Sequence, residues 1–122
     1  MKRDMDLVRK ILFEIKAKDT PYFRGGLHIE GYSEGQVYYH LSLLSDADLI
    51  VSEEIPTMSG DHPLIDVKRM TWKGHEFLDA SRDDERWKKA KGIFSKMGGA
   101  TIDVAIQILT KIMLEQANSL LA

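Results

Sequence analysis

Apolar residues recur at helical spacing in the first part of the chain. Four of them follow one another at i, i+3, i+4 and i+7: Val8, Ile11, Leu12 and Ile15. Asp4 precedes them and suits an N-cap, while Pro21 disfavours helical geometry in the residue before it. The pattern predicts a first helix over residues 4–18.

The next stretch, DTPYFRGGLHIEGY, changes character because one proline and three glycines interrupt it. Such residues mark connections rather than regular elements. Leu27-His28-Ile29 is the one segment here that alternates apolar and polar positions. We expect a connection that contains a short strand over residues 27–29.

A second helix has clear start signals. Ser33 and Gln36 fit a capping box, in which each side chain bonds the other residue's backbone N–H. A buried stripe follows, formed by Val37, Leu41 and Leu44. Asp48 stands where many helices end on a left-handed glycine, so the helix is expected over 33–47 and Asp48→Gly should be neutral or stabilising.

The remaining pattern predicts a hairpin followed by helices. LIVSEEIPT and PLIDVKRM flank the turn-like TMSGDHP, which predicts two paired strands over residues 49–70. Thr71 can cap a helix over 71–81, Asp83 opens one whose inner face holds Trp87, Ala90, Phe94 and Met97, and Thr101 opens a last one to about Leu121. The fold class is therefore mostly α with a small β hairpin, and residues 83–122 are a helical extension of the same domain.

Composition limits the number of domains, the chemistry and the cellular location that we expect. With 122 residues and 30% charged side chains, the chain suits one globular domain. It has no cysteine, which excludes disulfides, thiolate catalysis and the common structural zinc sites. The N-terminal MKRDMDLVRK lacks the apolar core of a signal peptide, and the apolar segment 102–114 is too short and too polar to cross a bilayer. We expect a cytoplasmic protein without membrane contact.

Charge is distributed unevenly along the chain. Residues 1–24 carry a net charge of +3, residues 25–67 carry −8 and no basic residue, and residues 68–122 carry +3. The acidic block covers the second predicted helix and most of the hairpin. That block carries most of the functional information in the sequence.

The order helix, short strand, helix, hairpin, helix resembles the winged-helix fold. VYYHLSLLSDADLIV is similar to the end of a recognition helix and the start of a wing, and MTWKGHEFLDA is similar to the segment after the wing. From MKRDMDLVRKIL through GHEFLDASRDDERWKKAKGI to GGATIDVAIQILTK, the chain also resembles a bacterial and prophage family of unknown function. The resemblance implies a winged-helix-like core over 1–82, although residues 19–32 leave little room for the usual second helix.

Two sets of residues on the predicted helices are candidates for contacts with a protein partner or with DNA. The outer side of the second helix would offer contacts to a partner or to base edges through Ser33, Gln36, Tyr39, His40 and Ser42. A basic run in the fourth predicted helix could contact phosphates: Arg86, Lys88, Lys89, Lys91 and Lys96. The simpler interpretation of both sets is a solvated helix face, and for the basic run the acid-first, base-last order also matches the helix dipole.

The last predicted helix is apolar over more than one face. One stripe is a candidate for self-association: Ile102, Ile106, Leu109 and Met113. The alternative is that this stripe completes the core of one chain. We expect Leu109→Asp to dissociate any oligomer.

No pattern predicts catalysis or a cofactor. The four histidines lack metal-ligand spacing, and no glycine-rich phosphate loop is present. We therefore expect a non-catalytic regulatory or adaptor module that contacts a protein through its acidic face. The alternative is a DNA-binding regulator that uses an unconventional basic surface.

Overall fold

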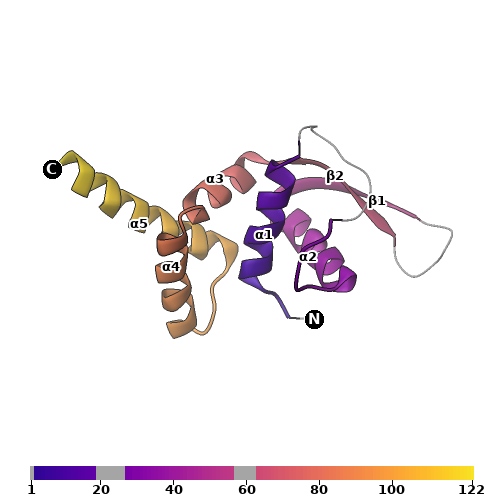
Figure 1. Ribbon diagram of the computed structural model, residues 1–122, viewed down its shortest axis with the longest axis horizontal. Helices are drawn as coiled ribbons and strands as arrows, with labels where there is room; N and C mark the ends of the chain where they lie inside the picture. Colours follow the sequence, from indigo (N-terminus) through magenta and orange to yellow (C-terminus); the bar gives the residue numbers. More distant parts are fainter. Residues whose placement is uncertain (1, 19–26, 57–62) are drawn as a thin grey trace. The chain divides into compact units, whose positions relative to one another are not determined.

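The computed structural model describes residues 2–18, 27–56 and 63–122. In chain order the elements are α1 (Met5–Lys16), α2 (Glu34–Asp46), β1 (Ile50–Ile55), β2 (Leu64–Met70), α3 (Trp72–Ser81), α4 (Asp84–Lys96) and α5 (Ile102–Leu121) (Figure 1). The predicted fold class, mostly α with a small β hairpin, is confirmed. The connection and the turn predicted over 19–26 and 57–62 lie outside the described residues.

The chain divides into two compact units, Met1–His75 and Glu76–Ala122, and α3 crosses from one to the other. The first contains α1, α2 and the hairpin. The second contains the end of α3 together with α4 and α5.

In the first unit, α1 begins and buries its stripe as predicted. The Asp4 carboxylate accepts hydrogen bonds from the backbone N–H groups of Asp6 and Leu7, at 2.9 and 3.3 Å. The expected apolar face is buried, and Leu7 joins it: Leu7, Val8, Ile11, Leu12 and Ile15. The helix ends at Lys16, two residues before the predicted end.

The strand predicted over residues 27–29 is wrong. Leu27 and Ile29 are buried, and His28 between them is exposed, so the alternation that suggested a strand is real. The segment has no ladder of hydrogen bonds, however, because β1 and β2 pair only with each other among the described residues. Alternating burial without a pairing strand does not make a sheet.

The hairpin returns the chain to the end of α2. β1 and β2 pair antiparallel, from Ile50 opposite Met70 to Ile55 opposite Leu64, with an irregularity between Val51 and Ser52. β1 starts, and β2 ends, beside the backbone of Asp48 and Leu49. The predicted hairpin over 49–70 is therefore confirmed.

Hydrogen bonds from Thr71 hold the backbone at Asp48 and Leu49 in place. Asp48 adopts a φ of 61°, the left-handed conformation expected of it. Its carbonyl accepts a hydrogen bond from the Thr71 hydroxyl, and the next carbonyl, of Leu49, accepts the Thr71 N–H at 3.0 Å. Thr71 Oγ1 also accepts the Gly74 N–H at 3.0 Å and so caps α3, as predicted.

The second unit is built around a row of aromatic rings. Trp87 of α4 makes edge-to-face contacts with Phe77 and Phe94, each with ring centroids 6.0 Å apart. Asp83 and Thr101 cap α4 and α5 as predicted. Met97 does not lie on the inner face as expected, because it is the C-cap of α4 and is 54% exposed.

We predict that Gly74→Ala destabilises the first unit. A Cβ at this position would overlap the Leu49 carbonyl oxygen and lie 2.6 Å from Met70 Cγ. Because backbone is one of the two obstacles, the cost should be about 1–3 kcal/mol in the free energy of unfolding, measured by urea denaturation.

Gly92→Ala is the matched control, since a Cβ there meets nothing within 4 Å and Gly92 lies inside α4. That variant should be more stable by roughly 0.5–1 kcal/mol. Equal stability of Gly74→Ala and the unsubstituted chain would contradict the close approach of α3 to Leu49.

Candidate functional site

The capping box at the start of α2 is formed as predicted. Ser33 Oγ accepts the Gln36 N–H at 3.1 Å, and Gln36 Oε1 accepts the Ser33 N–H at 2.8 Å. Both residues are exposed, but these oxygens are already committed to the helix. They are therefore less available to a partner than the sequence suggested.

His40 is not on the outer surface, so that prediction is wrong. Only 1% of the residue is exposed. Its Nε2 accepts the Asp4 N–H at 2.8 Å, and its Nδ1 lies 2.8 Å from the Gln36 carbonyl oxygen. Because a backbone N–H can only donate and a carbonyl oxygen can only accept, the ring proton is on Nδ1. His40 thereby joins α2 to the first turn of α1.

The surroundings of Asp4 reinforce this connection. Its second carboxylate oxygen accepts a hydrogen bond from the Tyr32 hydroxyl at 3.2 Å, and the Lys10 ammonium lies 5.4 Å from the centre of the Tyr32 ring. Burial raises the pKa of Tyr32, and the negative charge of Asp4 raises it further. One carboxylate thus caps α1 and anchors the residue that precedes α2.

The other two predicted contacts on α2 are half-buried. Tyr39 packs edge-to-face on His40, with ring centroids 5.6 Å apart, and the Ser42 hydroxyl donates to the Tyr38 carbonyl at 3.3 Å. The five residues chosen from the sequence do not share one exposed face. What α2 exposes at its ends is mainly carboxylate.

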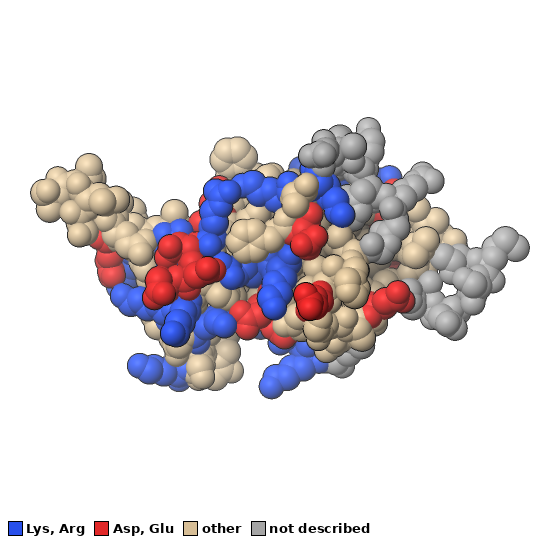
Figure 2. All heavy atoms as spheres, viewed as in Figure 1, with Lys and Arg blue, Asp and Glu red and all other residues tan. Residues whose placement is uncertain are grey.

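Six carboxylates of the first unit are exposed just before α2, on α2, between α2 and β1, and on β1, and we call them the acidic surface: Glu30, Glu34, Asp46, Asp48, Glu53 and Glu54. The described stretch 27–56 that carries them contains no Lys or Arg. Figure 2 shows a different pattern over α1 and α4, where basic and acidic side chains are interspersed. The carboxylates of this stretch lie on more than one face, since Glu53 and Glu54 are successive residues of β1.

Two interactions hold the hairpin part of this surface in place. Desolvation raises the pKa of Tyr38 on α2, and Glu54, whose carboxylate accepts a hydrogen bond from the Tyr38 phenol, raises it further. On β2, the buried Asp66 carboxylate accepts a hydrogen bond from Lys68 Nζ at 2.7 Å, and this bond raises the pKa of Lys68. Lys68 Nζ also lies 3.5 Å from Glu53, so a nearby positive charge is already paired with carboxylates.

The start of α3 carries an exposed aromatic side chain. Trp72, the first residue of α3, is 79% exposed. Its neighbour Thr71 bonds the Asp48 carbonyl, so Trp72 begins its helix beside the end of α2. Large exposed aromatic side chains are typical anchors of protein interfaces.

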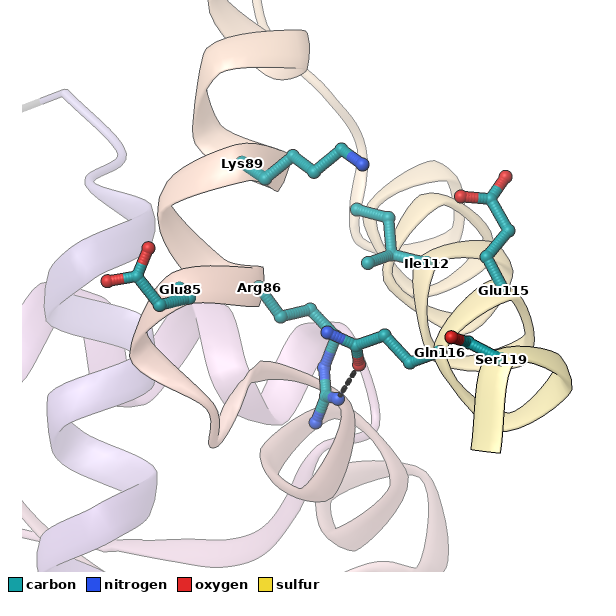
Figure 3. Close-up of a pocket in the computed structure, with 7 residues that line it drawn as sticks. All are labelled: Glu85, Arg86, Lys89, Ile112, Glu115, Gln116 and Ser119. Carbon is teal, nitrogen blue, oxygen red and sulfur yellow. Dashed lines mark hydrogen bonds between the residues drawn. The ribbon is translucent and has the colours of Figure 1, made fainter. Parts of the chain in front are cut away.

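In the second unit, Arg86 is a structural residue rather than a free phosphate contact. Its guanidinium donates from Nε to the Ala80 carbonyl at 2.6 Å, from Nη2 to the Asp79 carbonyl at 3.2 Å and from Nη1 to Gln116 Oε1 at 2.7 Å (Figure 3). It therefore ties the last carbonyls of α3 to α5. Of the predicted basic run, Lys88, Lys89 and Lys96 are exposed and Lys91 is half-buried.

An open cleft of about 400 Å³ lies between α4 and α5 beside Arg86. Its lining combines charged, polar and apolar side chains: Glu85, Arg86, Lys89, Ile112, Glu115, Gln116 and Ser119. Lys89 extends across it toward α5, whereas Glu85 points away from it (Figure 3). The cleft shows which side of α5 is turned toward α4.

The predicted self-association stripe on α5 needs correction. Leu109 is fully buried, and so belongs to the core with Ala105 and Ile112. Ile102, Ile106 and Met113 are half-buried. Leu109→Asp would therefore disrupt the core instead of reporting on an oligomer.

A search of the described residues finds no group of three or more His, Asp or Glu side chains that could hold a metal ion. Within the same residues, none of the helices has the length and apolar character needed to span a membrane.

Comparison with known proteins identifies the family. A family model described as "Hypothetical protein (DUF2513)" matches residues 2–100. The chain belongs to this family. Its expected membership in a family of unknown function is thereby confirmed, and the match to the DUF2513 model stops before α5.

A Haemophilus influenzae protein described as "Uncharacterized protein" is similar over nearly the whole length. It is 34% identical over 117 residues, which cover 93% of this chain and 96% of the relative. No solved structure matches the chain.

We predict that His40→Ala destabilises this DUF2513 protein by about 2–4 kcal/mol, because it removes a buried ring and leaves the Asp4 N–H and the Gln36 carbonyl without their partner. His28→Ala is the matched control, since His28 is exposed, and should change the free energy of unfolding by less than about 0.5 kcal/mol. Similar effects of both changes, measured by urea denaturation, would mean that His40 is not buried.

We also predict that Arg86→Met costs about 1.5–3 kcal/mol, because it removes three hydrogen bonds from a charged donor. Lys88→Met removes the same charge from an exposed position of the same helix and should be close to neutral. The comparison uses thermal and urea unfolding of both variants. If Arg86→Met leaves the free energy of unfolding unchanged, the three hydrogen bonds do not stabilise the fold, and Arg86 would again be a candidate for phosphate binding.

Proposed function

We propose that this protein is a non-catalytic regulatory or adaptor module, of phage or prophage type, whose acidic surface binds a basic segment of another protein. The observation that carries the proposal is the set of six exposed carboxylates on a stretch without any Lys or Arg. Opposite charges attract across an interface and speed the encounter of the partners. A basic partner is the chemistry that fits.

Trp72 supports a protein as the partner. Charge complementarity gives specificity and speed, but affinity comes mostly from a few apolar anchors. Trp72 begins α3 immediately after Thr71, which bonds the Asp48 carbonyl, so an exposed aromatic residue follows directly in the chain on the residue that is bonded to the end of α2. A partner with a basic and apolar segment would use both features.

The alternative function is DNA binding by a winged-helix regulator. The order of α1, α2, the hairpin and α3 resembles that fold, in which α2 would be the recognition helix and the hairpin the wing. Non-specific affinity for DNA comes mostly from basic residues that neutralise phosphates. Here α2 and β1 would bring carboxylates toward the phosphates, which makes standard docking unfavourable.

The exposed lysines of α4 are the feature that favours DNA. Lys88, Lys89 and Lys96 could contact phosphates without the participation of α2. Arg86 has weaker grounds for such a role, because its guanidinium is bonded to Ala80, Asp79 and Gln116. Docking through α4 would be unconventional for a winged-helix protein, so we rank it second.

The first test measures fluorescence anisotropy with two labelled probes, a random-sequence DNA duplex and a peptide rich in Lys and Arg. We expect no tight binding of the duplex even at low salt, and salt-sensitive binding of the peptide. Tight binding of the duplex that collapses with added salt would favour the DNA-binding alternative.

Matched variants then locate the peptide site. Neutralising Asp46→Asn, Asp48→Asn and Glu53→Gln together should weaken peptide binding by at least about fivefold, since three attractive charges are lost. Asparagine tolerates the left-handed conformation of residue 48, so folding should be retained. Neutralising Glu14, Glu85 and Glu115 to Gln changes the net charge equally at other exposed positions and should have a smaller effect. Equal weakening by both triple variants would mean that only net charge attracts the peptide.

A further inference from the structure

The last turns of α5 carry exposed apolar side chains beyond the buried ones. Ala105, Leu109 and Ile112 form the buried face. Farther along the helix, Leu114, Leu120 and Leu121 are 58%, 87% and 83% exposed. In Figure 1 this end of α5 projects beyond α4. Leucines exposed to this extent on one short segment call for a covering surface.

The exposed apolar side chains partly extend the buried face and partly lie beside it. Glu115, Gln116 and Ser119 line the cleft that α4 forms with α5, so they mark the side turned toward α4 (Figure 3). At 3.6 residues per turn, Leu114 and Leu121 fall on another side of the helix, whereas Leu120 lies close to the direction of Leu109 and continues the buried face toward the end of α5. All three leucines are nevertheless exposed, so the neighbouring elements of the second unit leave them uncovered.

The exposed face is symmetric about one small residue. Ala117 is exposed, and the apolar residues around it lie three and four positions before and after it: Met113, Leu114, Leu120 and Leu121. Residues at these spacings are neighbours on a helix surface. A small residue at the centre allows a second helix to approach closely, and the larger residues around it form the edges of the contact.

The face is also electrically neutral. Lys111 and Glu115 are the charged residues of the last three turns of α5. Helical spacing places Glu115 on the opposite side from Ala117 and Lys111 on the flank beside Leu114, outside the five apolar residues. A partner with its own charged surface would gain no electrostatic complementarity here. A second neutral apolar helix with the same spacing fits the face best.

We propose that two copies of this chain associate through antiparallel α5 helices, with Ala117 at the two-fold axis. An isologous contact requires a surface that matches itself after a half-turn, and the arrangement of apolar residues about Ala117 has this property. Leu114 then lies opposite Leu121 of the partner subunit, and Met113 lies opposite Leu120 of the partner subunit. Antiparallel packing also opposes the two helix dipoles favourably.

The available area fits a weak dimer. Complete burial of a leucine-sized side chain removes roughly 100 Å² from water, so the exposed parts of these five residues supply on the order of 300 Å² per copy. Two copies supply roughly 600 Å² of apolar area, or about 900 Å² in total at the usual apolar fraction of homodimers. Stable complexes of standard size bury more than about 1,200 Å². The dimer should therefore be concentration-dependent, with a dissociation constant in the micromolar range or weaker.

The decisive experiment is sedimentation of the full chain over a wide concentration range. The mass should rise from 13.9 kDa toward twice that value as concentration increases. Leu120→Lys with Leu121→Lys should raise the dissociation constant at least about 100-fold, because two exposed apolar contacts per copy are lost. Both side chains are exposed, so the thermal unfolding of the variant should be unchanged.

The control adds the same two charges to α5 away from the proposed contact. Gln107 lies before the segment that the partner helix would cover, and Ser119 lies on the side of the helix opposite Ala117. Gln107→Lys with Ser119→Lys should leave the dissociation constant within about threefold of the unsubstituted value. A chain that stays monomeric at the highest concentration overturns the proposal, as does a dimer that survives Leu120→Lys with Leu121→Lys. Equal loss in the control would assign the association to net charge and would overturn it too.

The orientation can be tested without background, because the chain contains no cysteine. In the antiparallel arrangement, a mixture of Leu114→Cys and Leu121→Cys chains should form a disulfide between unlike chains on oxidation. Each variant alone should form far less, since like positions are separated along the axis by about 9 Å for residue 114 and about 12 Å for residue 121. Efficient self-linking of each variant would indicate parallel helices and overturn the two-fold at Ala117.

Discussion

The arrangement of the first unit depends on the carbonyl groups of Asp48 and Leu49. Asp48 O accepts the Thr71 hydroxyl and Leu49 O accepts the Thr71 N–H, so one residue closes the hairpin onto the end of α2. Gly74 then allows α3 to pass close to Leu49, where a side chain would overlap the carbonyl. Without this closure, the carboxylates of α2 and β1 would not be held on adjoining elements.

His40 provides the corresponding constraint at the other side of α2. Its ring accepts the Asp4 N–H and donates to the Gln36 carbonyl, which fixes α2 against the start of α1. With α2 held by His40 and by the turn at Asp48, its outward positions are determined by the fold. Those positions are occupied by acidic side chains and by residues whose polar atoms serve the helix itself, which supports the proposal of a basic protein partner over DNA.

Local signals in the sequence were sufficient for the helix starts and the hairpin. Asp4, Ser33, Thr71, Asp83 and Thr101 all cap helices as predicted, because capping depends on residues within one turn. The strand over 27–29 was wrong because pairing depends on distant residues that the segment itself does not specify. The sequence indicated which residues of this segment are buried, but it did not indicate that the segment has no strand with which to pair.

The errors in the candidate sites have a similar origin. Val37, His40, Leu41 and Leu44 follow i, i+3, i+4 and i+7, so the spacing already placed His40 on the buried stripe, and its polarity alone argued for an outward position. On α5, Leu109 belongs equally to two neighbouring apolar stripes, and only the packing of α4 decides which is buried. The three hydrogen bonds of Arg86 join residues far apart in sequence and leave no local pattern.

The first unit exposes carboxylates and the second exposes neutral apolar side chains on α5, so salt should affect binding at the two surfaces differently. Attraction of a basic segment to the acidic surface weakens as salt screens the charges, whereas association of neutral apolar helices does not require charge. Salt should therefore separate the two kinds of contact in one protein. If both occur together, a dimer through α5 presents two acidic surfaces, and a partner with two basic segments would bind more tightly than one with a single segment. The proposed interface on α5 would then form more readily when such a partner is bound, because binding both surfaces at once raises the effective concentration of the two chains.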